Sequence, residues 1–556
     1  MKKFVIYRLL IVVWLTPAAV LAQQKDEWGK DREDLETVEI DVVGDKEIKL
    51  PNAARIFVPV PPQAVTRAEG GLEYSFKNFT YQGKDVPVSI RPKTIKSKAE
   101  SKLYGNYLRA GFGNYLTPYL EAFLANKRQK EYSYGAHVNF LNSFRGPVDG
   151  KNSASGIFSS RLFGNVYGDK AVLAGAVDYQ RDNWRYYGYP EGDTTVVSED
   201  IKQFFNRVRF SGEARSSEPE NDFQYLLKAG LNNISDNYGA SETNVYADLF
   251  TSLEVLENVK VLTGGGVNYL SRKNEADDVV NRMLITGDIA GLYEQDNFSV
   301  QAGLDIAYFN DTLGGNNGFK LYPQGKARYY LGKKFEVFAA FGGGVELNTL
   351  MGLTEENPFV HTDAYIANTT KPMAFSLGAS GNINNVLGLN AGMEYSRLKN
   401  AYFYANSLID TAKFELVYDS GGVSLFNPYA SIQFNKDELY RATFRADYYG
   451  YNMGSLQAPW HRPEYRVSLD AKFNIGNKII VGADLYFLGG IKARDNLLQE
   501  KKLDPVIDLN FGLEYLVGPR FTVFIDLNNI LGNNYMLYDR YKVKGFQAMA
   551  GVSYRF

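Results

Sequence analysis

The stretch Tyr465-Arg-Val-Ser-Leu-Asp-Ala-Lys-Phe-Asn-Ile475 decides the fold, because apolar residues stand at its odd positions and polar or charged residues at its even ones. The same alternation runs through residues 507–515 and again through 546–556, at the end of the chain. A period of two places successive side chains on opposite faces of a β-strand. Each stretch therefore predicts a strand with one apolar and one polar face, a pattern that soluble sandwiches share.

The lengths of the connections distinguish a soluble sandwich from a barrel that spans an outer membrane. Reading back from Phe556, long connections such as 529–544 and 489–504 alternate with tight ones such as 516–519 and 475–478. Strands that span an outer membrane need about 9–11 residues and are joined by short periplasmic turns and longer external loops. Eleven external connections predict 22 strands, and 20 is the alternative count because the apolar stretches within 398–425 cannot be placed. We therefore predict an all-β fold, a transmembrane antiparallel β-barrel over residues 102–556.

Composition agrees with a barrel and excludes several functions. The 556 residues include 52 Gly, 40 Tyr and 35 Phe, as expected for tight turns and for aromatic girdles at the two membrane interfaces. A net charge of −2 gives no reason to expect a nucleic-acid partner. The absence of cysteine excludes disulfides and thiolate metal sites. No phosphate loop, dinucleotide fingerprint or His-rich metal motif is present, so we expect no cofactor.

The first 101 residues are interpreted separately from the barrel. Residues 1–22 combine a basic start, an apolar run over 9–15 and a small residue at Ala22, which predicts a cleavable signal peptide, with an uncleaved anchor as the alternative. Export predicts a bacterial outer-membrane location. Pro51, Pro59, Pro61 and Pro62 interrupt the segment 23–101, because proline cannot donate to a strand ladder. We interpret 23–101 as a short N-terminal segment, either a periplasmic tether or a segment that threads into the lumen.

The end of the chain carries a resemblance to a known family. The stretch Phe521-Thr-Val-Phe-Ile-Asp-Leu-Asn-Asn-Ile-Leu-Gly-Asn-Asn-Tyr535, followed by Gly545 and by Gly551-Val-Ser-Tyr-Arg-Phe556, resembles the last two strands of TonB-dependent outer-membrane receptors. The stretch Ala458-Pro-Trp-His-Arg-Pro-Glu-Tyr465 resembles plug-deficient relatives of that family found in Bacteroidetes. The resemblance covers the chain from about residue 102 onward. It implies a 22-stranded barrel.

The chain departs from that family ahead of the barrel. A receptor of this type carries a lumen-filling plug preceded by a TonB box, whereas only residues 23–101 separate the predicted signal peptide from the barrel here. Residues 35–44 resemble the start of a plug or a TonB box, and we interpret the match as fortuitous or vestigial. Without a plug for TonB to pull, passage through the barrel would be diffusive or gated by a partner.

Three sets of residues are candidates for function. Two aromatic residues at the end of the last predicted strand, Tyr554 and Phe556, would serve as the signal that the outer-membrane assembly machinery reads. Ten charged residues are expected to line the lumen, either as a solute track or as a salt-bridged, hydrated wall: Arg441, Arg445, Asp447, Arg466, Asp470, Lys472, Asp484, Asp508, Glu514 and Asp526. Six loop residues are expected to be exposed and are candidate ligand or partner contacts, with a membrane-interface girdle as the alternative: Trp184, Tyr186, Tyr187, Tyr189, Trp460 and His461.

Neither catalysis nor metal binding is predicted. The chain has three histidines, and although His361 and Asp363 share a loop, no spacing defines a nucleophilic site. Acidic clusters such as Glu275, Asp277 and Asp278 lack the spacing of a calcium loop and are interpreted as solvated loop charge. We therefore expect a non-enzymatic barrel in outer-membrane lipid that passes a solute or polymer. The alternative is a non-transporting subunit that docks to another outer-membrane or periplasmic protein in an export or assembly complex.

Overall fold

The computed structural model describes residues 104–126, 129–190, 196–218, 221–311, 317–332, 334–384, 386–436, 439–495 and 498–556. The predicted signal peptide and the whole segment 23–101, including residues 35–44, lie outside these described residues. Within the described part of the chain, no helix is both long enough and apolar enough to cross a membrane.

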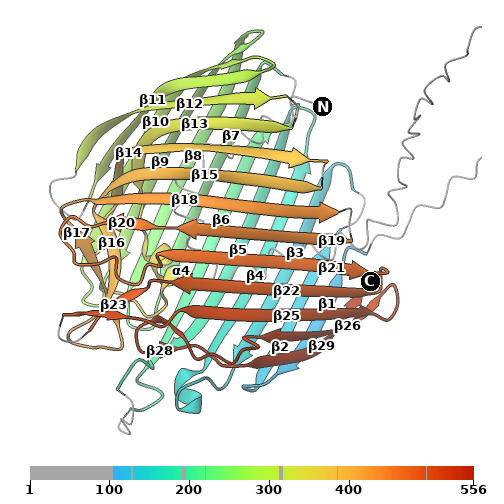
Figure 1. Ribbon diagram of the computed structural model, residues 1–556, viewed down its shortest axis with the longest axis vertical. Helices are drawn as coiled ribbons and strands as arrows, with labels where there is room; N and C mark the ends of the chain where they lie inside the picture. Colours follow the sequence, from blue (N-terminus) through green and yellow to red (C-terminus); the bar gives the residue numbers. More distant parts are fainter. Residues whose placement is uncertain are drawn as a thin grey trace, which may run out of the picture. The chain divides into compact units, whose positions relative to one another are not determined.

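A single closed antiparallel sheet forms the barrel (Figure 1). It has 22 strands, because the short segment β20 (Gly450–Asn452) continues β19 along the same neighbour, β18. This confirms the predicted count of 22. The barrel strands are β1 (Tyr107–Gly113), β2 (Thr117–Ala125), β3 (Tyr132–Ser143), β4 (Ser155–Tyr167), β5 (Ala171–Arg185), β6 (Lys202–Ser216), β7 (Phe223–Ser235), β8 (Ser241–Leu256), β9 (Val259–Lys273), β10 (Val279–Glu294), β11 (Phe298–Asn310), β12 (Gly318–Leu331), β13 (Phe335–Glu346), β14 (Thr369–Ile383), β15 (Leu387–Lys399), β18 (Val423–Lys436), β19 (Tyr440–Tyr448), β21 (Tyr465–Ile475), β22 (Ile479–Gly489), β25 (Val506–Leu516), β26 (Phe521–Asn528) and β29 (Gln547–Arg555).

The long connections carry the remaining secondary structure. These elements are η1 (Gly150–Ser153), α4 (Leu350–Glu356), β16 (Ala401–Asn406), β17 (Phe414–Asp419), β23 (Lys492–Arg494), β24 (Glu500–Lys502), β27 (Met536–Tyr538) and β28 (Tyr541–Lys542). The apolar stretches within 398–425 are thus explained, because β16 and β17 pair with each other in a hairpin outside the barrel sheet. In Figure 1 the labels α4, β16, β17, β23 and β28 gather at one end of the barrel, which we call the loop end.

The first and last strands close the barrel. β1 pairs with β29 in antiparallel register from Tyr107 opposite Arg555 to Gly113 opposite Met549. On the inner face Arg109 reaches past this seam, with its guanidinium 2.9 Å from Glu514 Oε1 and 3.3 Å from Asp526 Oδ2. Closure leaves no unpaired strand edge, and unpaired amides in lipid would each cost several kcal/mol.

Exposure confirms which face of each strand is outside. On β21 the odd residues Tyr465, Leu469 and Phe473 are exposed, whereas Arg466 and Asp470 on the even positions are partly covered. The same alternation on β29 exposes Val552 and Tyr554. An apolar outer surface around a polar interior is the arrangement a lipid bilayer requires, since lipid does not solvate charge.

The predicted tight turns lie at the end opposite the loops. Between β21 and β22, Gly476 and Asn477 both have positive φ angles, of 62° and 55°. Two consecutive positive φ angles are typical of the type I′ turn, whose twist matches that of a hairpin. Several barrel strands run to 15 or 16 residues, as in β8 and β10, so they exceed the length needed to span and extend the wall.

Candidate functional site

The ten predicted lumen residues lie on the inner face of their strands. Asp447 stands opposite Arg466, and Asp470 opposite both Thr443 and Asp484, so the charges of neighbouring strands meet across the sheet. The Arg445 guanidinium forms two hydrogen bonds to Asp447, with Nε 2.8 Å from Oδ2 and one terminal nitrogen 2.7 Å from Oδ1. Together with the Arg109 pairs, these contacts agree with a salt-bridged wall. A role for the ten residues in solute passage stays a prediction.

The loop end is filled by a hydrophobic core built from several loops. Its buried members come from four connections and from the inner wall: Tyr186, Phe205, Ile234, Leu350, Met351, Leu353, Phe359, Val360, Ile366, Tyr402, Tyr404, Ala412, Phe414, Tyr538 and Tyr541. The rings of Phe359 and Tyr541 stack with centroids 3.6 Å apart, and Phe414 contacts Tyr538 at 5.5 Å. We call this assembly the lid. Stacked aromatic rings with buried surface hold it together.

One arm of the lid is the connection between β13 and β14, residues 347–368, which we call the α4 loop. Its helix begins where the Thr349 side chain accepts a hydrogen bond from Gly352 N at 3.0 Å, an N-cap that satisfies one free amide. Leu350, Met351 and Leu353 bury the inner face of the helix in the lid core. The helix is seven residues long and would be marginal alone, so its stability comes from this packing.

The last two residues of the α4 helix are glutamates whose carboxylates contact different partners. Glu355 pairs with Arg209 on β6, and Glu356 pairs with Arg462 in the connection between β20 and β21. Glu356 Oε2 also accepts hydrogen bonds from the hydroxyls of Tyr402 at 2.8 Å and Tyr404 at 2.9 Å. Glu356 thus joins three loops around one carboxylate.

The ionisation of this group follows from its burial. Burial alone would lower the pKa of Arg462, but the Glu356 carboxylate and the neighbouring tyrosine hydroxyls together more than offset it, so the pKa is held well above its ordinary value. Burial, reinforced by the same carboxylate, raises the pKa of Tyr402 and of Tyr404 well above the usual range. Both hydroxyls therefore stay protonated as donors, and the pair carries one negative and one positive charge.

His461 links the β16–β17 hairpin to the connection between β26 and β29 through its ring. Its Nδ1 lies 2.8 Å from the carbonyl oxygen of Tyr404, and its Nε2 accepts the N–H of Asp539 at 3.2 Å. Burial lowers the pKa of His461 to about 4. The neutral ring suits both contacts, since Nε2 needs a lone pair to accept the amide and Nδ1 then carries the proton that it donates.

The six aromatic and histidine candidates of the loops are placed differently from the prediction. They were expected to be exposed, but Tyr186, Trp460 and His461 have at most 5% of their surface exposed. Trp184 and Tyr187 pack against the lid core, and Tyr189 donates a hydrogen bond to Asp149 at 2.7 Å. The premise of exposure is therefore wrong, as is a membrane-interface girdle for the buried ones, because loop-to-loop packing covers them. A contact with a ligand or partner stays a prediction.

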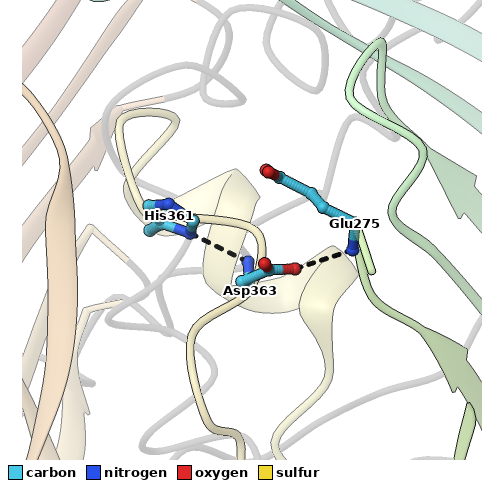
Figure 2. Close-up of side chains that lie close together, drawn as sticks. All are labelled: Glu275, His361 and Asp363. Carbon is cyan, nitrogen blue, oxygen red and sulfur yellow. Dashed lines mark hydrogen bonds between the residues drawn. The ribbon is translucent and has the colours of Figure 1, made fainter. Parts of the chain in front are cut away.

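Figure 2 shows a Glu275, His361 and Asp363 group where the β9–β10 connection meets the α4 loop. One potential ligand atom from each residue lies within 4.8 Å of the others. Each side chain already has a protein partner: His361 Nδ1 accepts Asp363 N, Asp363 Oδ1 accepts Glu275 N at 2.8 Å, and Glu275 Oε1 accepts the Thr362 hydroxyl. The group is a set of hydrogen bonds that joins the α4 loop to the β9–β10 connection.

Inner-wall arginines that alternation alone did not single out also hold the α4 loop. They are Arg207 and Arg209 on β6, Arg272 on β9 and Arg282 on β10. The alternation of side chains could have placed them on the inner face. Val267 on β9 and Ile285 on β10 are exposed outward, and so is Phe210 on β6. Their partners, up to 147 residues away in sequence, had no sequence signal.

The fold defines a class: the chain is a closed 22-stranded barrel with the architecture of bacterial outer-membrane receptors. Among solved structures it is similar to the FrpB iron transporter of Neisseria meningitidis (F3-3 variant), with a TM-score of 0.64 and 11% identity over 82% of each chain. It is also similar to the siderophore receptor PirA of Acinetobacter baumannii, with a TM-score of 0.62 and 9% identity over 82% of this chain and 81% of that one.

A third similar structure is FpvA of P. aeruginosa bound to heterologous pyoverdines, with a TM-score of 0.61 and 10% identity over 83% of this chain and 72% of that one. No protein-family model and no curated protein sequence matches the chain. At these identities the likeness shows the fold alone. It supports the predicted outer-membrane location.

Proposed function

We propose that this protein passes a solute or polymer across the outer membrane through a barrel whose loop end opens and closes. The observation that carries the proposal is the lid: four connections bury a shared aromatic core across the end of a polar-walled barrel. The inner faces of β19 and β21 carry charges of both signs, which suits a hydrated path for a solute. Passage requires the lid to move, because close-packed rings leave no continuous water path.

Electrical recording on the mature protein in planar bilayers tests this function. Wild type should be closed most of the time and conduct in rare steps. Replacing residues 350–366 by a short Gly-Ser linker should make the open state dominant. A second variant that also lacks residues 23–101 distinguishes a sealed lid from a lumen filled by that segment. Silence from a correctly folded form of this second variant would contradict passage.

A docking role remains as a second candidate because of the tip of the β16–β17 hairpin. Leu408 and Ile409 lie there with 58% and 96% of their surface exposed, although Ser407 N and Lys413 O hold the turn in place with a 2.9 Å hydrogen bond. Exposed apolar side chains on an ordered tip are suited to a protein contact. Under this hypothesis Leu408→Ser with Ile409→Ser should abolish co-purification of a stoichiometric partner, while Glu199→Gln should not.

A further inference from the structure

The inner wall near the loop end carries four arginines on the strands β6, β9 and β10, which we call the arginine patch: Arg207, Arg209, Arg272 and Arg282. Two acids share this wall, since Asp182 pairs with Arg207 and Glu242 lies 3.5 Å from Arg282. The wall itself therefore has two positive charges more than negative ones in this group. Such an excess on a covered surface needs an anionic or carbonyl-rich partner.

The α4 loop supplies that partner through its main chain. Arg272 donates to the carbonyl oxygens of Thr362 and of Ala364, the latter at 2.7 Å. Arg282 donates to the carbonyl oxygen of Asn348 at 2.7 Å and to the side-chain oxygen of Asn368 at 3.2 Å.

Glu242 on β8 completes the main-chain contacts from the acceptor side. Its Oε1 accepts the backbone N–H of Leu350 at 2.7 Å. Donors and an acceptor on one wall thus match the two hydrogen-bonding groups of a polypeptide backbone.

One carboxylate completes the contact. Glu355 pairs with Arg209, and its Oε1 lies 3.9 Å from Arg207 Nε, while Arg207 also donates to the Thr354 hydroxyl at 3.0 Å. Two guanidinium groups around one carboxylate make a site for an acidic side chain. The wall therefore contacts two kinds of group together, backbone carbonyl and amide groups and a carboxylate.

We propose that the arginine patch with Glu242 is a binding site for acidic peptides, and that the α4 loop occupies it as a built-in competitor. The inference rests on the proposed function, because an acidic peptide would be what the open barrel receives. A tethered loop competes at an effective concentration in the millimolar range for short flexible linkers, so a free peptide binds well only when the loop is weakened. Peptide binding and lid opening are then coupled: each favours the other.

The test is calorimetric titration of the full mature chain in detergent with a short oligoglutamate, with oligolysine and oligoglutamine as matched peptides. Wild type should bind oligoglutamate weakly. Glu355→Gln removes the competitor's carboxylate and should tighten oligoglutamate binding about fivefold or more. Glu199→Gln, an exposed loop acid that contacts none of the four arginines in the structure, is the matched control and should bind as wild type does.

A double substitution in the wall should give the opposite result. In the Glu355→Gln background, Arg272→Gln with Arg282→Gln should reduce oligoglutamate binding at least tenfold and leave oligolysine unaffected. Should Glu355→Gln fail to fold, the variant with a Gly-Ser linker in place of residues 350–366 exposes the patch directly and should bind oligoglutamate. No binding by the folded linker variant, or equal binding by every variant, would overturn the proposal.

Binding and conduction fail separately. Oligoglutamate that binds the patch in a barrel that never conducts would contradict the proposed passage and leave the binding site standing. A barrel that conducts with its linker variant but ignores oligoglutamate would contradict the binding site and leave passage standing.

Discussion

Replacing Glu356 by alanine should open the lid without unfolding the barrel. The change leaves the Arg462 guanidinium without its carboxylate and removes the carboxylate acceptor that the Tyr402 and Tyr404 hydroxyls share. Removing one partner of a buried ion pair costs about 3–5 kcal/mol. Because 17% of the Arg462 side chain is still exposed, the lower value of about 3 kcal/mol is the better figure. The lid would then open about 100-fold more often.

Hydrogen exchange of the α4 amides measures that opening. Leu353 N and Asn357 N donate to Thr349 O at 3.0 Å and Leu353 O at 2.8 Å, so both are protected while the helix is docked. Their exchange should accelerate about 100-fold in Glu356→Ala, while amides of β21 keep their rate. Glu199→Gln removes an exposed acid and should change neither, since such substitutions stay within about 0.5 kcal/mol.

A paired substitution separates charge from packing. Glu356→Met with Arg462→Met removes both buried charges, so it should accelerate exchange less than Glu356→Ala alone. Unchanged exchange of the α4 amides in Glu356→Ala would refute the view that this carboxylate holds the loops together.

Three further results are expected. The closed lid requires the neutral ring of His461, and burial lowers the pKa of this ring to about 4. The free energy that stabilises the closed lid therefore has its full value above pH 6.5 and falls by up to ~3 kcal/mol as the pH drops toward 4. Hydrogen exchange of the α4 amides should become faster over this pH range, and His461→Gln should flatten the dependence. Arg109→Gln removes the guanidinium that Glu514 and Asp526 share across the seam, so the barrel should lose the gel migration of its folded form in detergent at a lower temperature. An unchanged transition would show that strand pairing alone closes the seam. Tyr541→Ala removes a ring stacked on Phe359, should cost about 3–5 kcal/mol of lid stability, and should raise open-channel time in planar bilayers.

The barrel could be predicted from the sequence because the orientation of each side chain and the position of each turn depend on neighbouring residues in the chain. Odd residues of 465–475 face lipid and even ones face inward, since a strand turns its side chains by half a revolution at every step. Turn chemistry is equally local, as Gly476 and Asn477 show. Strand number followed from counting such turns. The β16–β17 hairpin escaped the count because an apolar hairpin has the same period whether it faces lipid or other loops.

The lid depended on tertiary structure. Arg207 meets Thr354, 147 residues away, and Arg462 meets Glu356, 106 residues away, and neither spacing has a period that a sequence displays. Tyr186 and Trp460 are residue types that often form exposed binding surfaces in loops. They are buried here because other loops pack over them. The sequence by itself determined which faces are wet, because solvation acts on each side chain separately. Which loops meet above the lumen was decided by the closed barrel, which brings distant connections to the same end.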